Sequence, residues 1–125
     1  MKTVVIIEDE PEFCEILLIL FERMGYYVLI YNDGESGLKS VEQEKPDLLI
    51  LDLNLPKLSG EVICRTLKDS TNAELSQIPI IILTAKNTDA DRIAIKAMGA
   101  DVFMTKPVML SNLMSEVSKF IPAAA

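Results

Sequence analysis

The sequence contains no histidine and no tryptophan, and it has only two cysteines. These counts leave too few nitrogen and sulfur ligands for a zinc site. No apolar run approaches the roughly 20 residues that a membrane-spanning helix needs. Basic residues are also scarce, since 12 Lys and Arg stand against 19 Asp and Glu for a net charge of −7. No basic patch is visible, so we do not expect direct nucleic-acid binding. Because no long apolar run is present, we do not expect a membrane segment either.

What is present has the composition of one globular domain. The chain has 125 residues, of which 50% are hydrophobic and 25% are charged. A domain of this size buries roughly two-thirds of its unfolded surface, so its core needs no disulfide. The N-terminus leads directly into an apolar strand, which argues against a cleaved signal peptide. We therefore expect a cytoplasmic protein whose two cysteines are buried thiols.

Five short apolar runs alternate with stretches of helical character. Most runs are continuously apolar, which is typical of parallel strands buried on both faces. They occupy residues 4–7, 27–31, 48–51, 80–83 and 102–104, and helices are predicted at 11–24, 36–44, 60–68, 88–98 and 111–120. This alternation predicts an α/β fold: a flavodoxin-like three-layer sandwich with a five-stranded parallel sheet in the order 2-1-3-4-5 and five helices. The domain would cover residues 1–121, with 122–125 as a tail or the start of a linker.

Polar residues follow the ends of four predicted strands. Glu8 and Asp9 follow the first, Asp52 the third and Thr84 the fourth, and Lys106 comes at the end of the fifth. Each has an ordinary explanation by itself, such as acidic residues at a helix N-terminus. Because parallel strands end at one edge of a sheet, their conjunction predicts a common site.

The residue types at this edge suit phosphoryl transfer. Two carboxylates about 5 Å apart repel by roughly 3 kcal/mol at an effective dielectric near 20. A bound cation relieves that cost, and oxygen ligands alone favour Mg²⁺. Asp52 would be the nucleophile. Lys106 would neutralise charge on the phosphoryl oxygens, and Thr84 would donate a hydrogen bond to one of them.

Four motifs in order carry a resemblance to a known family. They read I-I-E-D-E after the first strand, L-D-L-N-L-P-K-L-S-G around Asp52, I-I-I-L-T-A at Thr84 and G-A-D-V-F-M-T-K-P near the C-terminus. With them, residues 3–121 resemble a bacterial response regulator receiver domain of two-component or phosphorelay signalling. The resemblance implies a phosphorylation-dependent switch that takes its phosphoryl group from a sensor histidine kinase or a histidine phosphotransfer protein. Such a domain catalyses its own phosphorylation and dephosphorylation and is not a turnover enzyme.

The resemblance also assigns a metal and acceptor site. Asp52 matches the phosphorylated aspartate. Asp9 matches the direct ligand of Mg²⁺, Glu8 matches a ligand that acts through water, and Asn54 would offer its backbone carbonyl. Asn54 also lies at a position that tunes dephosphorylation in relatives, as does Lys86.

A second group of residues is implied as the switch. Thr84 matches the hydroxyl residue that moves to the phosphoryl group, and Phe103 matches the aromatic residue that then turns inward. Lys106 matches the family's lysine, and its bond to Pro107 would be cis. The responding surface would comprise residues 91–96, 102–104 and 111–118. It would control an output partner or a fused output domain, and phosphorylation-dependent dimerisation stays open.

Two other classes of protein remain as alternatives. A flavin-binding protein of the same fold would need a loop rich in hydroxyl groups and glycine after the first strand, where this chain has acidic residues. An aspartyl-nucleophile phosphatase would carry a second Asp where Asn54 stands. Within the receiver family, a stand-alone receiver and a piece of a longer regulator are both open.

The first predicted helix raises a further question. Phe13, Ile16, Leu17, Leu20 and Met24 follow helical spacing, so this stripe is expected to face the sheet. Cys14, Leu18 and Ile19 fall off the stripe. They are either part of a wider buried face or a docking patch for the phosphoryl donor.

Overall fold

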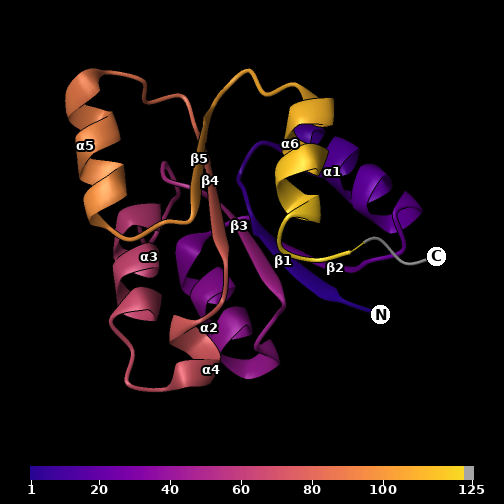
Figure 1. Ribbon diagram of the computed structural model, residues 1–125, viewed down its shortest axis with the longest axis horizontal. Coiled ribbons are helices and arrows are strands. Elements are labelled where there is room, and N and C mark those ends of the chain that lie inside the picture. Colours follow the sequence, from indigo (N-terminus) through magenta and orange to yellow (C-terminus); the bar gives the residue numbers. More distant parts are fainter. Residues whose placement is uncertain (123–125) are drawn as a thin grey trace.

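The computed structural model describes residues 1–122. Five strands alternate with helices along the chain (Figure 1). The strands are β1 (Thr3–Ile7), β2 (Tyr27–Tyr31), β3 (Leu48–Asp52), β4 (Ile80–Thr84) and β5 (Val102–Thr105). The helices are α1 (Pro11–Arg23), α2 (Gly34–Glu44), α3 (Gly60–Lys68), α4 (Ala73–Ser76), α5 (Asp89–Ala97) and α6 (Leu110–Ser118). None of the helices in this part of the chain has the length and apolarity that a bilayer crossing requires.

The predicted sheet is confirmed. All neighbouring strands pair in parallel, in the order β2-β1-β3-β4-β5. The central strands β3 and β4 are buried at every position, as their continuous apolar runs predicted. The expected number of helices was wrong, because residues 1–122 form six rather than five. The extra helix, α4, begins where the Asn72 side chain accepts a hydrogen bond from the Glu74 backbone N–H.

The helices cover the two faces of the sheet in separate layers (Figure 1). Helices α1 and α6 lie on one face, and α2, α3 and α5 lie on the other. Each face has its own buried apolar cluster, one that includes Phe21 of α1 and one that includes Ile63 of α3. The three-layer sandwich expected from the sequence is therefore present.

The buried stripe of α1 differs from the predicted one. Cys14, Leu17 and Phe21 are buried, whereas Ile16 is 47% exposed. Cys14 turns inward because its thiol donates a hydrogen bond of 3.2 Å to the backbone carbonyl of Glu8. The stripe is thus rotated toward Cys14, and Ile16 and Ile19 face outward.

The N-terminus of α3 packs directly against the end of β3. Gly60 donates its backbone N–H to the carbonyl of Leu53, at 3.0 Å. A Cβ atom at Gly60 would collide with the backbone carbonyl of Asp52, so only glycine fits this approach. The side chain of Ser59 caps the helix by accepting a hydrogen bond from the backbone N–H of Val62. This contact fixes the first turn of α3 beside Asp52.

Candidate functional site

Three buried polar side chains gather at the carboxyl edge of the sheet. Glu8 follows β1, Asp52 ends β3 and Thr84 ends β4. Their exposed fractions are 2%, 5% and 1%, although the rest of the buried core is almost entirely apolar. Burying polar groups is costly unless they are paired. This edge of the sheet therefore marks a candidate site, as the strand-end pattern predicted.

Lys106 provides the positive charge that balances these carboxylates. Its Nζ lies 2.7 Å from Glu8 Oε1, 2.7 Å from Glu10 Oε1 and 3.3 Å from Asp52 Oδ2. The same ammonium lies 5.2 Å from the centre of the Phe13 ring. One cation thus bridges the ends of β1, β3 and β5.

The shifted pKa values of Glu8 and Lys106 reflect this arrangement. Burial raises the pKa of Glu8, and the hydrogen bond from Lys106 opposes that rise. Burial also disfavours the charged form of Lys106, but hydrogen bonds to Glu10 and Glu8 outweigh it and raise the pKa of Lys106 well above its usual range. The lysine is therefore a permanent cation at neutral pH.

Asp52 presents its carboxylate to a cavity beside Lys106. Its Oδ1 accepts a hydrogen bond of 3.2 Å from the backbone N–H of Asn54. The cavity has a volume of about 580 Å³. Its walls are Asp9, Glu10, Asp52, Asn54, Thr84, Ala85, Lys86 and Lys106. The sequence-predicted residues Asp9, Asn54, Asp52, Thr84 and Lys106 thus share one cavity.

Thr84 is held by the loop that follows it. Its hydroxyl oxygen accepts a hydrogen bond of 3.2 Å from the backbone N–H of Lys86. The Lys86 ammonium in turn lies 2.7 Å from Glu61 Oε2, on the first turn of α3. The hydrogen bond to Glu61 raises the pKa of Lys86. Burial opposes this rise but has the smaller effect, so the pKa lies above its usual value. Sequence reasoning did not foresee this ion pair.

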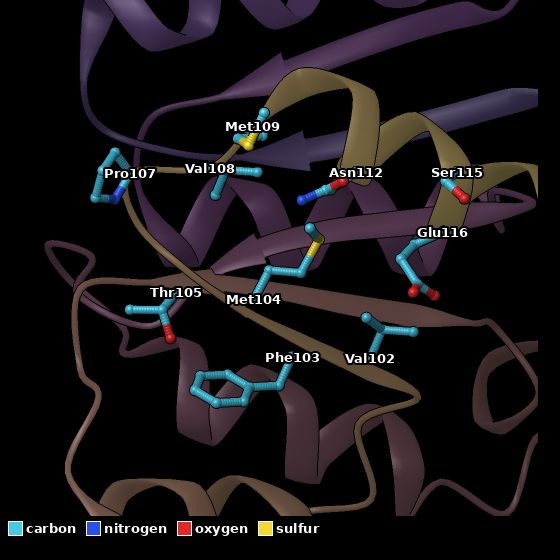
Figure 2. Close-up of a pocket in the computed structure, with 10 residues that line it drawn as sticks. All are labelled: Val102, Phe103, Met104, Thr105, Pro107, Val108, Met109, Asn112, Ser115 and Glu116. Carbon is cyan, nitrogen blue, oxygen red and sulfur yellow. The ribbon is translucent and has the colours of Figure 1, made fainter.

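Phe103 lies away from the cavity that holds Asp52. It is partly buried and packs against the apolar cluster on the α3 and α5 face of the sheet. Figure 2 shows Phe103 and Met104 on opposite sides of β5, with Met104 on the side of α6. Residues of β5, α6 and the loop between them line a second cavity of about 460 Å³, and Phe103 is one of these residues. The peptide bond between Lys106 and Pro107 is cis.

The donor set at the site fits a hard divalent cation. Within residues 1–122, Glu8, Glu10 and Asp52 form a group whose carboxylate oxygens all lie within 4.8 Å of one another. Oxygen ligands without nitrogen or sulfur are the set that Mg²⁺ prefers. The predicted ligand Asp9 is exposed and lines the same cavity without being part of this group. Glu10 is a member that sequence reasoning missed, although its place after Glu8 and Asp9 was a usable signal.

Comparison with known proteins decides the family. Residues 4–118 match the model of the response regulator receiver domain. The chain belongs to this family. Receiver domains act in two-component signalling, bind Mg²⁺ in an acidic pocket and are generally not turnover enzymes. Neither a flavin-binding protein nor a phosphatase is therefore needed to explain the site.

Individual relatives agree with this assignment. The chain is 41% identical over 106 residues to the alkaline phosphatase synthesis transcriptional regulatory protein PhoP of Bacillus subtilis, covering 85% of this chain and 42% of PhoP. It is 34% identical to the protein PilH of Pseudomonas aeruginosa, covering 94% of this chain and 96% of PilH. The signal receiver domain of a histidine kinase from Syntrophus aciditrophicus superposes with a TM-score of 0.87 at 32% identity, over 96% of this chain and 89% of that one.

These relatives differ in length. This receiver domain spans less than half of PhoP but nearly all of PilH. The sequence left open whether the chain is a stand-alone receiver or part of a longer regulator. Both alternatives have counterparts among these relatives.

Proposed function

We propose that Asp52 is the phosphoryl acceptor of this receiver domain. The observation that carries the proposal is the position of its carboxylate, which is buried at the end of β3, faces a cavity of about 580 Å³ and lies 3.3 Å from the Lys106 ammonium. A carboxylate oxygen of Asp52 attacks the phosphorus atom of a phosphohistidine. A P–O bond forms, the P–N bond breaks, and the departing electron pair stays on the imidazole nitrogen.

The neighbouring side chains support this transfer by charge and hydrogen bonding. Lys106 offsets the charge on the phosphoryl oxygens, because its ammonium already lies among the carboxylates of the site. The Thr84 hydroxyl, which lines the same cavity, donates to a phosphoryl oxygen. Glu8, Asp9, Asp52 and the Asn54 backbone carbonyl would hold Mg²⁺. When bound, that ion offsets the negative charge shared by Asp52 and the phosphoryl oxygens.

The same residues support self-dephosphorylation. Water reaches the site through the open cavity and attacks the phosphorus atom of the aspartyl phosphate. The bond to Asp52 breaks, and inorganic phosphate leaves. The domain then catalyses its own phosphorylation and dephosphorylation and is not a turnover enzyme for an external substrate.

The switch couples Thr84 to Phe103. When the Thr84 hydroxyl turns to the phosphoryl group, it gives up its hydrogen bond to the Lys86 N–H, and the loop after β4 moves with it. Phe103 is partly buried on the neighbouring strand and turns into the space that this movement opens. The surface of α5, β5 and α6 thereby changes. It acts on an output partner or on a fused output domain, and it is the surface through which a phosphorylation-dependent dimer would form.

A groove beside the acceptor supports a protein as phosphoryl donor. It has a volume of about 650 Å³. Its walls are mainly apolar, and they include Phe13, Ile16, Pro107, Val108 and Leu110. A sensor histidine kinase or a histidine phosphotransfer protein would dock an apolar surface there while presenting its phosphohistidine to Asp52.

The extent and location of the domain follow from the same proposal. Ile121 is 3% exposed and belongs to the apolar cluster on the α1 and α6 face, which supports a receiver unit that runs to residue 121. Residues 123–125 of the predicted tail lie outside the described residues. A cytoplasmic location fits a partner of the kinase or regulator class, and neither a membrane nor direct nucleic-acid contact by this domain is part of the proposal.

Intact-mass measurement tests the proposal. The chain is incubated with acetyl phosphate, with and without Mg²⁺, as the wild type and as Asp52→Asn. We expect a Mg²⁺-dependent gain of one phosphoryl group that the variant loses. If the phosphoryl group is lost too fast for mass spectrometry to detect the adduct, beryllofluoride titration still detects the acceptor site. A wild type that shows neither the adduct nor beryllofluoride binding would refute the proposal.

A further inference from the structure

One of the residues that line the acceptor cavity, Lys86, forms an ion pair with a residue of α3. The Lys86 ammonium lies 2.7 Å from Glu61 Oε2, and Lys86 also lines the cavity that contains Asp52. The two partners come from the loop after β4 and from α3, 25 residues apart in sequence. Lys86 and Lys106 are the two cations that line this cavity. Lys86 thus lines the cavity that contains Asp52, while its ammonium is bound to Glu61.

The two ends of this pair are attached to different parts of the site. Glu61 lies on the first turn of α3, which Gly60 fixes against the backbone of Asp52. Lys86 is joined to Thr84, because its backbone N–H donates to the Thr84 hydroxyl. A single residue therefore has its side chain bound to α3 and its backbone bound to the predicted switch hydroxyl.

Phosphorylation would change the balance of charges around Lys86. Before it, Asp52 is one of three carboxylates on Lys106, and Glu61 holds Lys86. Phosphorylation replaces the single negative charge of the Asp52 carboxylate with a phosphoryl group that carries between one and two negative charges. The side chains of Lys86 and Glu61 are 43% and 35% exposed, and ion pairs of such exposure are weak. Lys86 can therefore readily exchange its partner Glu61 for a more highly charged anion.

We propose that Glu61 is a positioning residue that competes with the phosphoryl group on Asp52 for the Lys86 ammonium. This inference rests on the proposed function of Asp52 as the acceptor. In the unphosphorylated domain, Glu61 holds Lys86 and, through it, the loop that binds the Thr84 hydroxyl. In the phosphorylated domain, Lys86 donates to the phosphoryl oxygens, and the loop is released toward Asp52.

Competition predicts opposite effects for the two partners of one ion pair. Glu61→Gln removes the competitor, so Lys86 becomes more available to the acceptor. Lys86→Gln removes the ammonium for which Glu61 and the phosphoryl group compete. A pair that only braces the loop would behave differently, because loss of either partner would loosen the same contact and shift both variants in the same direction.

The test is a beryllofluoride titration at saturating Mg²⁺, followed by NMR on the wild type and variants. We expect Glu61→Gln to bind beryllofluoride about two- to fivefold more tightly, the range set by exposed ion pairs. Lys86→Gln should bind it more weakly by a similar factor, and the double variant should resemble Lys86→Gln. Glu35→Gln is the matched control, because Glu35 holds the corresponding position at the start of α2, and it should leave the affinity unchanged.

A second measurement needs neither metal nor phosphoryl analogue. The hydrogen bond from Glu61 raises the pKa of Lys86, so NMR titration of the Lys86 side chain in EDTA should show a lower pKa in Glu61→Gln. Shifts of Glu61→Gln and Lys86→Gln in the same direction, or an unchanged pKa of Lys86, would overturn the inference while Asp52 stays the acceptor. A wild type that binds beryllofluoride no better than Asp52→Asn would overturn the proposed function and this inference with it.

Discussion

The Lys106 ammonium lies 2.7 Å from Glu8 Oε1, although 98 residues separate the two in sequence. Their strands are not neighbours either, since β3 and β4 lie between β1 and β5. The long side chain of Lys106 spans the distance between these two strand ends. The pair is well shielded, with 14% of the Lys106 side chain and 2% of the Glu8 side chain exposed.

Lys106→Met should destabilise the domain. The substitution keeps much of the apolar stem but leaves Glu8, Glu10 and Asp52 without their shared cation. Removing one partner of a buried ion pair costs about 3 kcal/mol. Urea unfolding in EDTA would measure the loss. Lys119→Met is the control, because that lysine pairs with Glu116 on the surface and should contribute little. Equal stability of both variants would contradict the structural role of Lys106.

Gly60→Ala should also destabilise the domain and disturb the acceptor. The added Cβ atom would meet the backbone carbonyl of Asp52 and the Cα atom of Leu53, neither of which can turn aside. Overpacking of this kind costs about 1 to 3 kcal/mol. Thermal unfolding would measure the loss, and acetyl phosphate labelling should slow because Asp52 is displaced. Val62→Ala, two residues along at an exposed site on the same helix, should affect both measurements much less.

The two cysteines should resist alkylation in the native state. Both are buried, and burial together with the nearby carboxylate of Glu8 raises the pKa of Cys14 to about 11. Against the ordinary value of 9.0, this leaves about one-hundredth as much thiolate at pH 8. Iodoacetamide labelling followed by mass spectrometry should show little modification of Cys14 and Cys64 at pH 8. The rate at Cys14 should rise as the pH approaches 11, while labelling in urea should be fast at pH 8. Rapid native labelling of Cys14 at pH 8 would contradict its placement.

Ile16→Glu should slow phosphotransfer from a protein donor about tenfold or more, the size of effect that loss of an apolar interface contact produces. Ile16 is 47% exposed and lines the apolar groove beside the acceptor. Acetyl phosphate does not need the groove, so labelling by it should be unchanged. Ile93→Glu is the control, because Ile93 is 71% exposed on α5 and is not part of the groove. The docking role fails if Ile16→Glu slows both donors equally or neither of them.

The sequence predicted those features that depend on short-range patterns. Continuous apolar runs located all five strands, and the polar residues at the ends of four of them located the carboxyl edge of the sheet. These predictions succeeded because a parallel sheet brings the carboxyl ends of its strands to one edge, independently of the side-chain conformations there. The resemblance then assigned roles to Asp52, Thr84, Phe103 and Lys106, and these roles remain predictions.

Features that depend on side-chain direction were not predictable in this way. The pairing of Glu10 with Lys106, and of Glu61 with Lys86, depends on how long flexible side chains meet across loops. The rotation of the α1 stripe depends on a hydrogen bond from Cys14 to a backbone carbonyl, which no hydrophobic periodicity contains. Helix α4 has only four residues, so it offers too little periodicity to be recognised.

The acceptor cavity and the apolar groove share a wall. Glu10, Ala85 and Lys106 line both spaces. A molecule seated in the groove therefore touches the same lysine that neutralises charge in the cavity, and an anion in the cavity draws on a residue that the groove ligand contacts. Linkage makes such an effect reciprocal: if a docked partner changes the free energy of phosphoryl binding, the phosphoryl group changes the free energy of partner binding by the same amount and with the same sign. A partner docked in the groove and a phosphoryl group in the cavity would thus affect each other's binding through the residues that line both spaces.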